Sequence, residues 1–182
     1  DLSDVISKKV SNDKNEFFIS IKKNVTPAKC FGGELSLYEQ NRDFSGDFDS
    51  IFREIENTLS LWDENSMISR VNRNDESVVL NQIFIDNFNY AMRAAELSEG
   101  YFDPTVGPLV SAWGFHFKDG VEMTPEIVDS LKQFVGYHKI KIEDGKVIKE
   151  NPDMTLDFNA VAQGYTTDMI GDFLLLNGVE NF

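Results

Sequence analysis

The sequence is poor in cysteine and histidine. Among its 182 residues, Cys30 is the single cysteine, and His116 and His138 are the only histidines. An intrachain disulfide and a zinc site built from cysteines are therefore excluded, and two histidines do not make a histidine-rich metal cluster. Because Cys30 is isolated in a lysine-flanked stretch, a Cys–His nucleophile is also disfavoured.

Positive charge is scarce as well. The chain has 17 lysine and arginine residues against 31 aspartate and glutamate residues, so its formal net charge is −14. Its lysine groups are each diluted by acidic residues, and no basic stripe is present that could attract a polyanion. Nucleic-acid binding is therefore disfavoured. An anionic ligand would need local help from backbone amides or a metal ion.

Long apolar runs are missing too. None approaches the roughly 20 residues that span a bilayer, while 41% hydrophobic and 12% aromatic residues indicate a folded protein. The chain opens with Asp1 rather than Met, so we expect a removed leader or other upstream residues, and a missing signal peptide says nothing about the compartment. After Gly178 an apolar run begins that usually announces another strand, so we expect the chain to stop before its fold is complete.

The hydrophobic pattern predicts both helices and strands. Helices are expected over 47–61, capped by Asp47 or Ser45, over 81–98, capped by Asn81 and ended by Gly100, from Thr124 to Gly136, and over 160–176. Strands are expected at 16–21, after the glycine turn in 31–38, at 155–158, and in a hairpin of 139–143 and 146–149 around Asp144-Gly145. Because helices and strands do not alternate strictly, we predict an α+β fold with a mixed or antiparallel sheet flanked by helices.

Residues 100–115, GYFDPTVGPLVSAWGF, pack two prolines, three glycines and four aromatic residues between two predicted helices. One interpretation is a buried connecting loop whose aromatic residues fill the core, with Asp103 capping a turn before Pro104. The other is a binding loop, since loops carry many functional sites. The residues alone favour the buried loop.

Residues 156–165, LDFNAVAQGY, lead from a predicted strand into a helix whose first turns are small residues. Unpaired N–H groups and the helix dipole at such a start can hold a phosphate or another anion. Alternatively, Asn159 caps the helix while Ala160, Ala162 and Gly164 allow close helix–sheet packing. These two interpretations stand equal on the residues alone.

Residues 62–72, WDENSMISRVN, follow the first predicted helix. Trp62 is expected either in the core or stacked on a flat ring, and Asp63, Glu64 and Ser66 are expected in a solvated turn. Elsewhere the sequence has no G-x-S-x-G elbow, no phosphate-binding G-x-x-x-x-G-K-[ST] loop, no G-x-G-x-x-G and no H-E-x-x-H. Paired-carboxylate hydrolysis stays open, because no spacing singles out one acidic pair.

These three segments resemble motifs of the ApbE family, the FAD:protein FMN transferases. Residues 100–115 are similar to its G-x-F-D-P-T-V-G-P-L-V-x-x-W-G-F stretch, and 156–168 to its L-D-hydrophobic-x-x-[IV]-A-K-G-Y-x-x-D stretch. Residues 62–72 are similar to [YW]-x-x-x-S-x-[IL]-S-x-[IL]-N, and 31–33 to a weaker M-G-T turn. The resemblance implies that 30–182 is the N-terminal portion of such a domain, with 1–29 a leader or edge segment.

The resemblance further implies an activity and a set of site residues. Family members use Mg²⁺ to transfer FMN from FAD to a Thr or Ser hydroxyl of a target flavoprotein, releasing AMP. The implied FAD contacts are Phe31, Trp62, Tyr101, Phe102, Asp103, Asp157 and Gln163. Ala160 holds the position of a metal ligand, and its main-chain carbonyl is a hard oxygen donor that suits Mg²⁺.

Two departures from the family keep alternatives open. Gln163 stands where a lysine is common, and an amide brings no positive charge to a pyrophosphate. Family chains are also longer, so we expect an incomplete metal site here. A metal-dependent FAD pyrophosphatase that yields FMN and AMP, and a non-catalytic flavin-binding domain, are the rival functions. For the parent protein, the resemblance implies a lipoprotein at the periplasmic face of the inner membrane, with its lipid anchor outside this chain.

Overall fold

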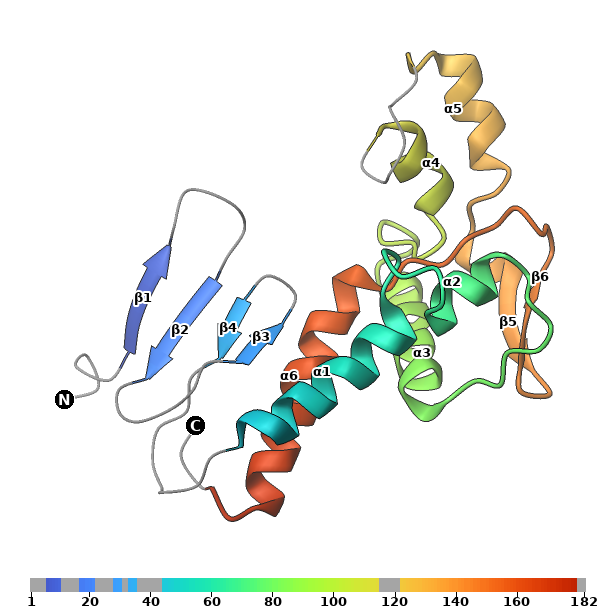
Figure 1. Cartoon of the computed structure of the whole chain (residues 1–182). Coiled ribbons are helices and arrows are strands. Elements are labelled where there is room, and N and C mark those ends of the chain that lie inside the picture. Colours follow the sequence, from blue (N-terminus) through green and yellow to red (C-terminus); the bar gives the residue numbers. More distant parts are fainter. Residues whose placement is uncertain are drawn as a thin grey trace. The chain divides into compact units, whose positions relative to one another are not determined.

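The computed structural model describes residues 6–10, 17–21, 28–30, 33–35, 44–114 and 122–179. The chain divides into two compact units, one formed by Asp1–Glu54 with Gln163–Phe182 and the other by Ile55–Ala162. Two long helices, α1 (Ser45–Leu59) and α6 (Asn159–Leu176), each begin in one unit and end in the other (Figure 1).

The first unit contains a four-stranded mixed sheet (Figure 1). Its strands, in spatial order, are β1 (Ile6–Val10), β2 (Phe17–Ile21), β4 (Gly33–Leu35) and β3 (Ala28–Cys30). Strands β1 and β2 are antiparallel, with Ile6 opposite Ile21, whereas β2 and β4 are parallel and β3 and β4 antiparallel. The predicted α+β class with a mixed sheet is thus confirmed.

Aromatic packing between α1 and the C-terminal turns of α6 forms the core of the first unit. The Phe173 ring lies 5.4 Å from Phe44 and 5.7 Å from Phe48, between ring centroids, with both pairs edge to face. The buried members of this core are Phe44, Phe48, Phe52, Ile170, Leu174 and Val179. Helix α6 ends as predicted, because Gly178 adopts φ +78° and the Val179 N–H donates to the Leu174 carbonyl at 3.0 Å.

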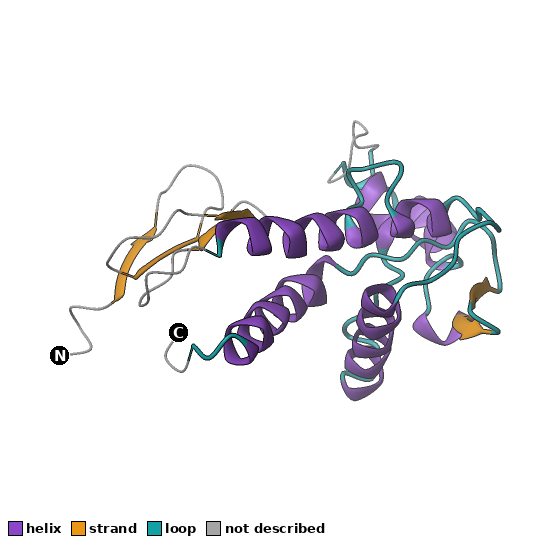
Figure 2. Ribbon diagram, turned by 60° about the horizontal axis from the view of Figure 1, so that its bottom comes forward, coloured by secondary structure: helices purple, strands orange, loops and turns teal. Residues whose placement is uncertain are grey.

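The second unit combines helices with one hairpin (Figure 2). Its elements are α2 (Met67–Asn72), α3 (Gln82–Leu97), α4 (Gly107–Ala112), α5 (Pro125–Lys132), a 3₁₀ turn (Tyr137–Lys139), β5 (Ile140–Glu143) and β6 (Lys146–Lys149). Phe158 lies edge to face against Phe84 at 5.4 Å, in a core where both rings are fully buried. Among the described residues, no helix has the length and apolar character needed to cross a bilayer.

The predicted caps Asn81 and Thr124 and the hairpin are confirmed, whereas Asp47, one of the two caps considered for the first helix, lies inside α1. Asn81 accepts the Phe84 N–H at 2.9 Å at the start of α3, and Thr124 accepts the Ile127 N–H at 3.4 Å at the start of α5. The tight turn between β5 and β6 has positive φ at both Asp144 and Gly145, as the Asp-Gly pair predicts. Helix α5 ends at Lys132, four residues earlier than expected.

Other expectations about local structure were wrong. Residues 155–158 form no strand, because the main chain of Leu156 pairs with the side chain of Asn72 instead of with a neighbouring strand. The short helix α4 lies in a segment that we interpreted as a loop, and α2 follows the expected turn at a place where we expected no helix. Each has six residues, which is too short for a helical hydrophobic period to be recognised. Ser66, expected in a solvated turn, is fully buried and caps α2.

Candidate functional site

A pocket of about 470 Å³ in the second unit joins two of the segments singled out by the sequence. One wall comes from residues 100–106 and another from residues 157–160 at the start of α6, with Val135 between α5 and the 3₁₀ turn completing it. The lining residues are Gly100, Tyr101, Phe102, Asp103, Val106, Val135, Asp157, Asn159 and Ala160.

The first wall begins where α3 ends. Gly100 adopts φ +81°, and its N–H donates to the Ala95 carbonyl at 2.8 Å, so the chain turns sharply out of the helix. The Ser98 hydroxyl then accepts the Phe102 N–H at 3.0 Å. These two bonds determine where Tyr101 and Phe102 enter the pocket.

Asp103 and Thr105 bond to a segment more than 30 residues away. The Asp103 carboxylate accepts the Thr105 N–H at 2.8 Å and the Tyr137 N–H at 2.9 Å. The Thr105 hydroxyl donates to Asp103 Oδ1 and accepts the Gly136 N–H at 2.7 Å. Together these bonds tie the first wall to the turn that follows Val135.

The second wall is held from both sides. The Asp157 N–H donates to the Pro104 carbonyl at 2.8 Å, which joins the two walls directly. On the other side, the Asn72 amide donates to the Leu156 carbonyl at 2.9 Å and accepts the Leu156 N–H at 2.7 Å. At the start of α6 the Asp157 carboxylate accepts the Asn159 N–H at 2.8 Å, and Asn159 is the first residue of the helix and not the cap that one interpretation expected.

Comparison with known proteins assigns this architecture to a family. Residues 26–182 match the ApbE family. This chain belongs to the ApbE family. It is 29% identical over 140 residues to a protein named FAD:protein FMN transferase from Vibrio cholerae, covering 75% of this chain and 42% of that protein. A protein of the same name from Chlamydia muridarum is 28% identical over 151 residues, covering 81% and 48%.

Solved structures of the family have the same fold. The flavin transferase ApbE from Vibrio cholerae, in its H257G mutant, superposes with a TM-score of 0.78 at 26% identity, covering 86% of this chain and 57% of that one. The apo flavinyl transferase ApbE of Pseudomonas stutzeri shares the fold, with a TM-score of 0.72 at 20% identity over 85% and 53%. The chain spans about half the length of the curated relatives it matches.

The structure brings five of the residues implied by the ApbE motifs into one pocket. Tyr101, Phe102, Asp103, Asp157 and Ala160 all line it, with Tyr101 almost fully exposed at 97%. The pocket therefore contains members of the two longest motifs.

The other candidates that the structure describes, Trp62 and Gln163, do not line this pocket. Trp62 is 58% exposed, which contradicts a place in the core, and it is not among the lining residues. Gln163 is exposed one turn further along α6 and belongs to the first unit. Phe31 lies outside the described residues.

The donor set for a metal ion is small in the described part of the chain. No three His, Cys, Asp or Glu side chains come together there as a metal site. The pocket does offer the carboxylate of Asp157 and the main chain of Ala160, the second residue of α6. Mg²⁺ in phosphate-binding sites commonly takes one or two carboxylates, the substrate's phosphates and several waters. These oxygens therefore fit Mg²⁺ as a partner of a bound phosphate.

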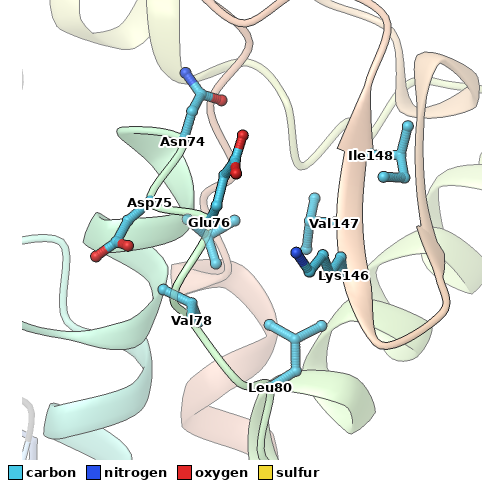
Figure 3. Close-up of a pocket in the computed structure, with 9 residues that line it drawn as sticks. Asn74, Asp75, Glu76, Val78, Leu80, Lys146, Val147 and Ile148 are labelled. Atoms are coloured by element: carbon cyan, nitrogen blue, oxygen red, sulfur yellow. The ribbon is translucent and has the colours of Figure 1, made fainter.

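A second pocket of about 330 Å³ lies between the loop after α2 and the β5–β6 hairpin (Figure 3). Asp75 and Glu76 come from the loop side, and Lys146 from the hairpin side. Hydrogen bonds from Ser77 and Arg70 lower the pKa of Asp75 to about 2, so this carboxylate is used within its own loop. None of the described candidate residues lines this pocket.

Sequence reasoning missed the residues that hold the pocket walls. Asn72 and Thr105 bond to main-chain groups of distant segments, and Thr155 lies against Gly107. None of the three is among the residues that line the pocket. A Cβ at Gly107 would lie 2.3 Å from the Thr155 hydroxyl oxygen, so only glycine fits there without a shift. Asn72, Thr105 and Gly107 stand at specified positions of the ApbE motifs, and those positions are the signal that could have found them.

Proposed function

We propose that the protein transfers FMN from FAD to a Thr or Ser hydroxyl of an acceptor flavoprotein, in the presence of Mg²⁺ and with release of AMP. The observation that carries this proposal is the pocket built from residues 100–106 and 157–160. These residues belong to the two longest ApbE motifs, and the Asp157–Pro104 bond joins them. The names of the relatives support the proposal for the flavin and its transfer.

The pocket has the chemistry that a dinucleotide requires. The exposed ring of Tyr101 and the half-buried ring of Phe102 offer flat apolar surfaces for a flavin or an adenine. The first turn of α6 lines the same pocket through Asn159 and Ala160, and a helix start favours negative charge. In a chain of net charge −14, these backbone dipoles would take the place of missing basic residues.

The residues that we assign to the metal lie in the wall formed by residues 157–160. The main-chain oxygen of Ala160 would hold Mg²⁺ together with phosphate oxygens, and Asp157 is the pocket carboxylate beside it. When bound, Mg²⁺ would neutralise the charge that develops as a phosphoanhydride bond breaks. The protein's own part is to orient the dinucleotide so that the acceptor hydroxyl reaches the phosphorus of the FMN half.

The direct test is mass spectrometry of an acceptor domain incubated with the full-length protein, FAD and Mg²⁺. We expect the acceptor to gain the mass of FMN, with AMP as the second product. Release of free FMN and AMP without attachment would replace the proposal with a pyrophosphatase. Binding of FAD without any product would replace it with a flavin-binding domain.

A matched pair of variants connects the result to the pocket. Tyr101→Ala removes the exposed ring at the pocket wall, whereas Tyr90→Ala removes an exposed ring of the same type on α3. We expect slower transfer from Tyr101→Ala and an unchanged rate from Tyr90→Ala. Equal rates for the two variants would contradict the assignment of this pocket to FAD.

A further inference from the structure

Thr105 is a buried polar residue for which the ApbE motifs imply no contact with a ligand. Its side chain is fully buried, and its hydroxyl donates to Asp103 Oδ1 while accepting the Gly136 N–H at 2.7 Å. A buried hydroxyl that is satisfied on both sides rigidifies the segments it joins, because losing either bond leaves a buried polar group without a partner.

The carboxylate of Asp103 is engaged by the protein itself. Oδ1 accepts the N–H and the hydroxyl of Thr105, and Oδ2 accepts the N–H of Tyr137 at 2.9 Å. Both oxygens therefore face protein donors. A carboxylate turned toward an anionic nucleotide would repel it, whereas one surrounded by three donors has its charge balanced locally.

These four bonds form one unit, which we call the Asp103–Thr105 brace. It ties residues 103–105 to Gly136 and Tyr137, which follow Val135 directly. Val135 and Asp103 line the same pocket, together with Tyr101 and the start of α6. The brace therefore sets the distance between the 100–106 wall and Val135, by bonds between residues that are 31 and 34 positions apart in the chain.

We propose that Thr105 is a positioning residue of the nucleotide pocket, and that Asp103 acts on the ligand through this brace rather than by direct contact. The inference rests on the proposed function in one respect, namely that the pocket takes FAD. It assigns a role to a residue that touches no ligand, and it changes the role that the motif resemblance implies for Asp103.

The experiment is a double-mutant cycle measured as the dissociation constant for FAD in the presence of Mg²⁺, by calorimetry on the full-length protein. The variants are Thr105→Val, Asp103→Asn and the double variant, at a temperature where circular dichroism shows each of them fully folded. Thr105→Val keeps the shape and removes both hydroxyl bonds. Asp103→Asn cannot satisfy both sides, because its amide nitrogen must face the N–H of either Thr105 or Tyr137.

We expect each single variant to weaken FAD binding about tenfold, and the double variant to be no weaker than the worse single one. Thr105→Ser retains the hydroxyl and is the matched control, expected to stay within about twofold of the wild type. If Thr105→Val does not fold, Asp103→Asn and Thr105→Ser still decide the question through hydrogen exchange. Faster exchange of the Gly136 and Tyr137 amides in Asp103→Asn, with wild-type rates in Thr105→Ser, supports the brace.

Three outcomes would overturn the inference. If Thr105→Val binds FAD like the wild type while Asp103→Asn does not, then Asp103 contacts the ligand directly. Additive losses in the cycle would mean that the two residues act independently. If the wild type itself does not bind FAD, the proposed function fails and the inference fails with it, whereas the first two outcomes leave the proposed function intact.

Discussion

The core of the first unit and the pocket region of the second are stabilised in different ways. In the first unit, Phe44, Phe48 and Phe173 pack edge to face between two helices. In the second, the pocket walls are held by side-chain bonds to distant main-chain groups, with Asn72 on Leu156 and Thr105 on Gly136. Apolar packing is non-directional and tolerates small shifts, whereas these hydrogen bonds need defined distances and angles.

This difference matters for a binding site. A pocket wall made of irregular loop must have its main-chain polar groups satisfied one by one, because no helix or sheet ladder does so. The second unit meets that requirement with amide, hydroxyl and carboxylate side chains. The following predictions test the contrast, from the largest expected effect to the smallest.

The largest effect should come from the aromatic core. Phe48→Ala removes a side chain that is 2% exposed and leaves a cavity beside Phe44 and Phe173. We expect the free energy of unfolding to fall by about 3–5 kcal/mol, measured by urea denaturation. Leu176→Ala, at a position 88% exposed, is the control and should change stability by about 0.5 kcal/mol or less. Equal losses would contradict this placement of the core.

Asn72→Ala should be the most costly change among the polar braces. It leaves the N–H and the carbonyl of buried Leu156 without partners, and each such group costs about 1–3 kcal/mol. We expect a loss of about 2–4 kcal/mol in urea denaturation, together with weaker FAD binding because Asp157 follows Leu156. Asn89→Ala, an exposed position on α3, is the matched control. A variant as stable as this control would show that the Asn72 bonds are dispensable.

Substitutions at two glycines should change stability by smaller amounts and in opposite directions. Gly107→Ala would place a Cβ 2.3 Å from the Thr155 hydroxyl, and we expect it to cost about 1–3 kcal/mol. Gly164→Ala lies within α6 with nothing within 4 Å of the added Cβ, and we expect it to gain about 0.5–1 kcal/mol. Thermal unfolding of both variants measures the difference. Thr155→Ala combined with Gly107→Ala should recover part of the loss, and no recovery would exclude this contact as its cause.

Because Lys149 is only half-buried and solvent screens its charge, the smallest effect should be a pH dependence from this lysine. Burial lowers the pKa of this lysine to about 8, with Asp153 opposing the shift, while its ammonium donates to the Asn72 carbonyl at 3.1 Å. Between about pH 8 and the ordinary lysine pKa of 10.5 the unfolded chain binds the extra proton, so stability contributed by this group rises with pH.

The measurement is urea denaturation across that pH range for Lys149→Met and the wild type. We expect the wild type to gain stability relative to Lys149→Met as the pH rises, because only the wild type is relieved of a half-buried charge. Lys141→Met, which removes an exposed lysine from the neighbouring strand β5, is the control for the loss of one charge. Parallel curves for wild type and Lys149→Met would refute the assignment.

The sequence predicted those parts of the fold whose causes are local. Apolar residues three or four apart predicted α1 and α3, Asn81 was predicted as a cap from its side chain alone, and Asn177-Gly178 predicted the end of α6. The Asp144-Gly145 pair predicted the hairpin, because the positive φ angles that the turn needs suit these residues. Each of these signals lies within a few residues of the structure that it predicts.

The features that the sequence did not predict depend on residues that are far apart in the chain. Residues 155–158 have the composition of a strand, but the partner of Leu156 is a side chain 84 residues earlier. Trp62 was undecided between the core and stacking on a flat ring, and its exposure depends on which segments the fold leaves uncovered. At 100–115 the residues favoured a buried loop over a binding loop, and in the structure this segment combines both features, with Thr105 buried and Tyr101 exposed.

By itself, the sequence determined the long helices α1, α3 and α6, the β5–β6 hairpin, the α+β class and the motifs by which the ApbE family is recognised. It also determined the scarcity of positive charge, which requires an anionic ligand to rely on backbone dipoles or a metal ion. Only the tertiary structure decided that Asp103 and Thr105 face Gly136 and Tyr137, and that Asn72 faces Leu156. The physical reason is range, because a hydrogen bond requires its two atoms to lie about 3 Å apart, and local pattern carries no information about such distances.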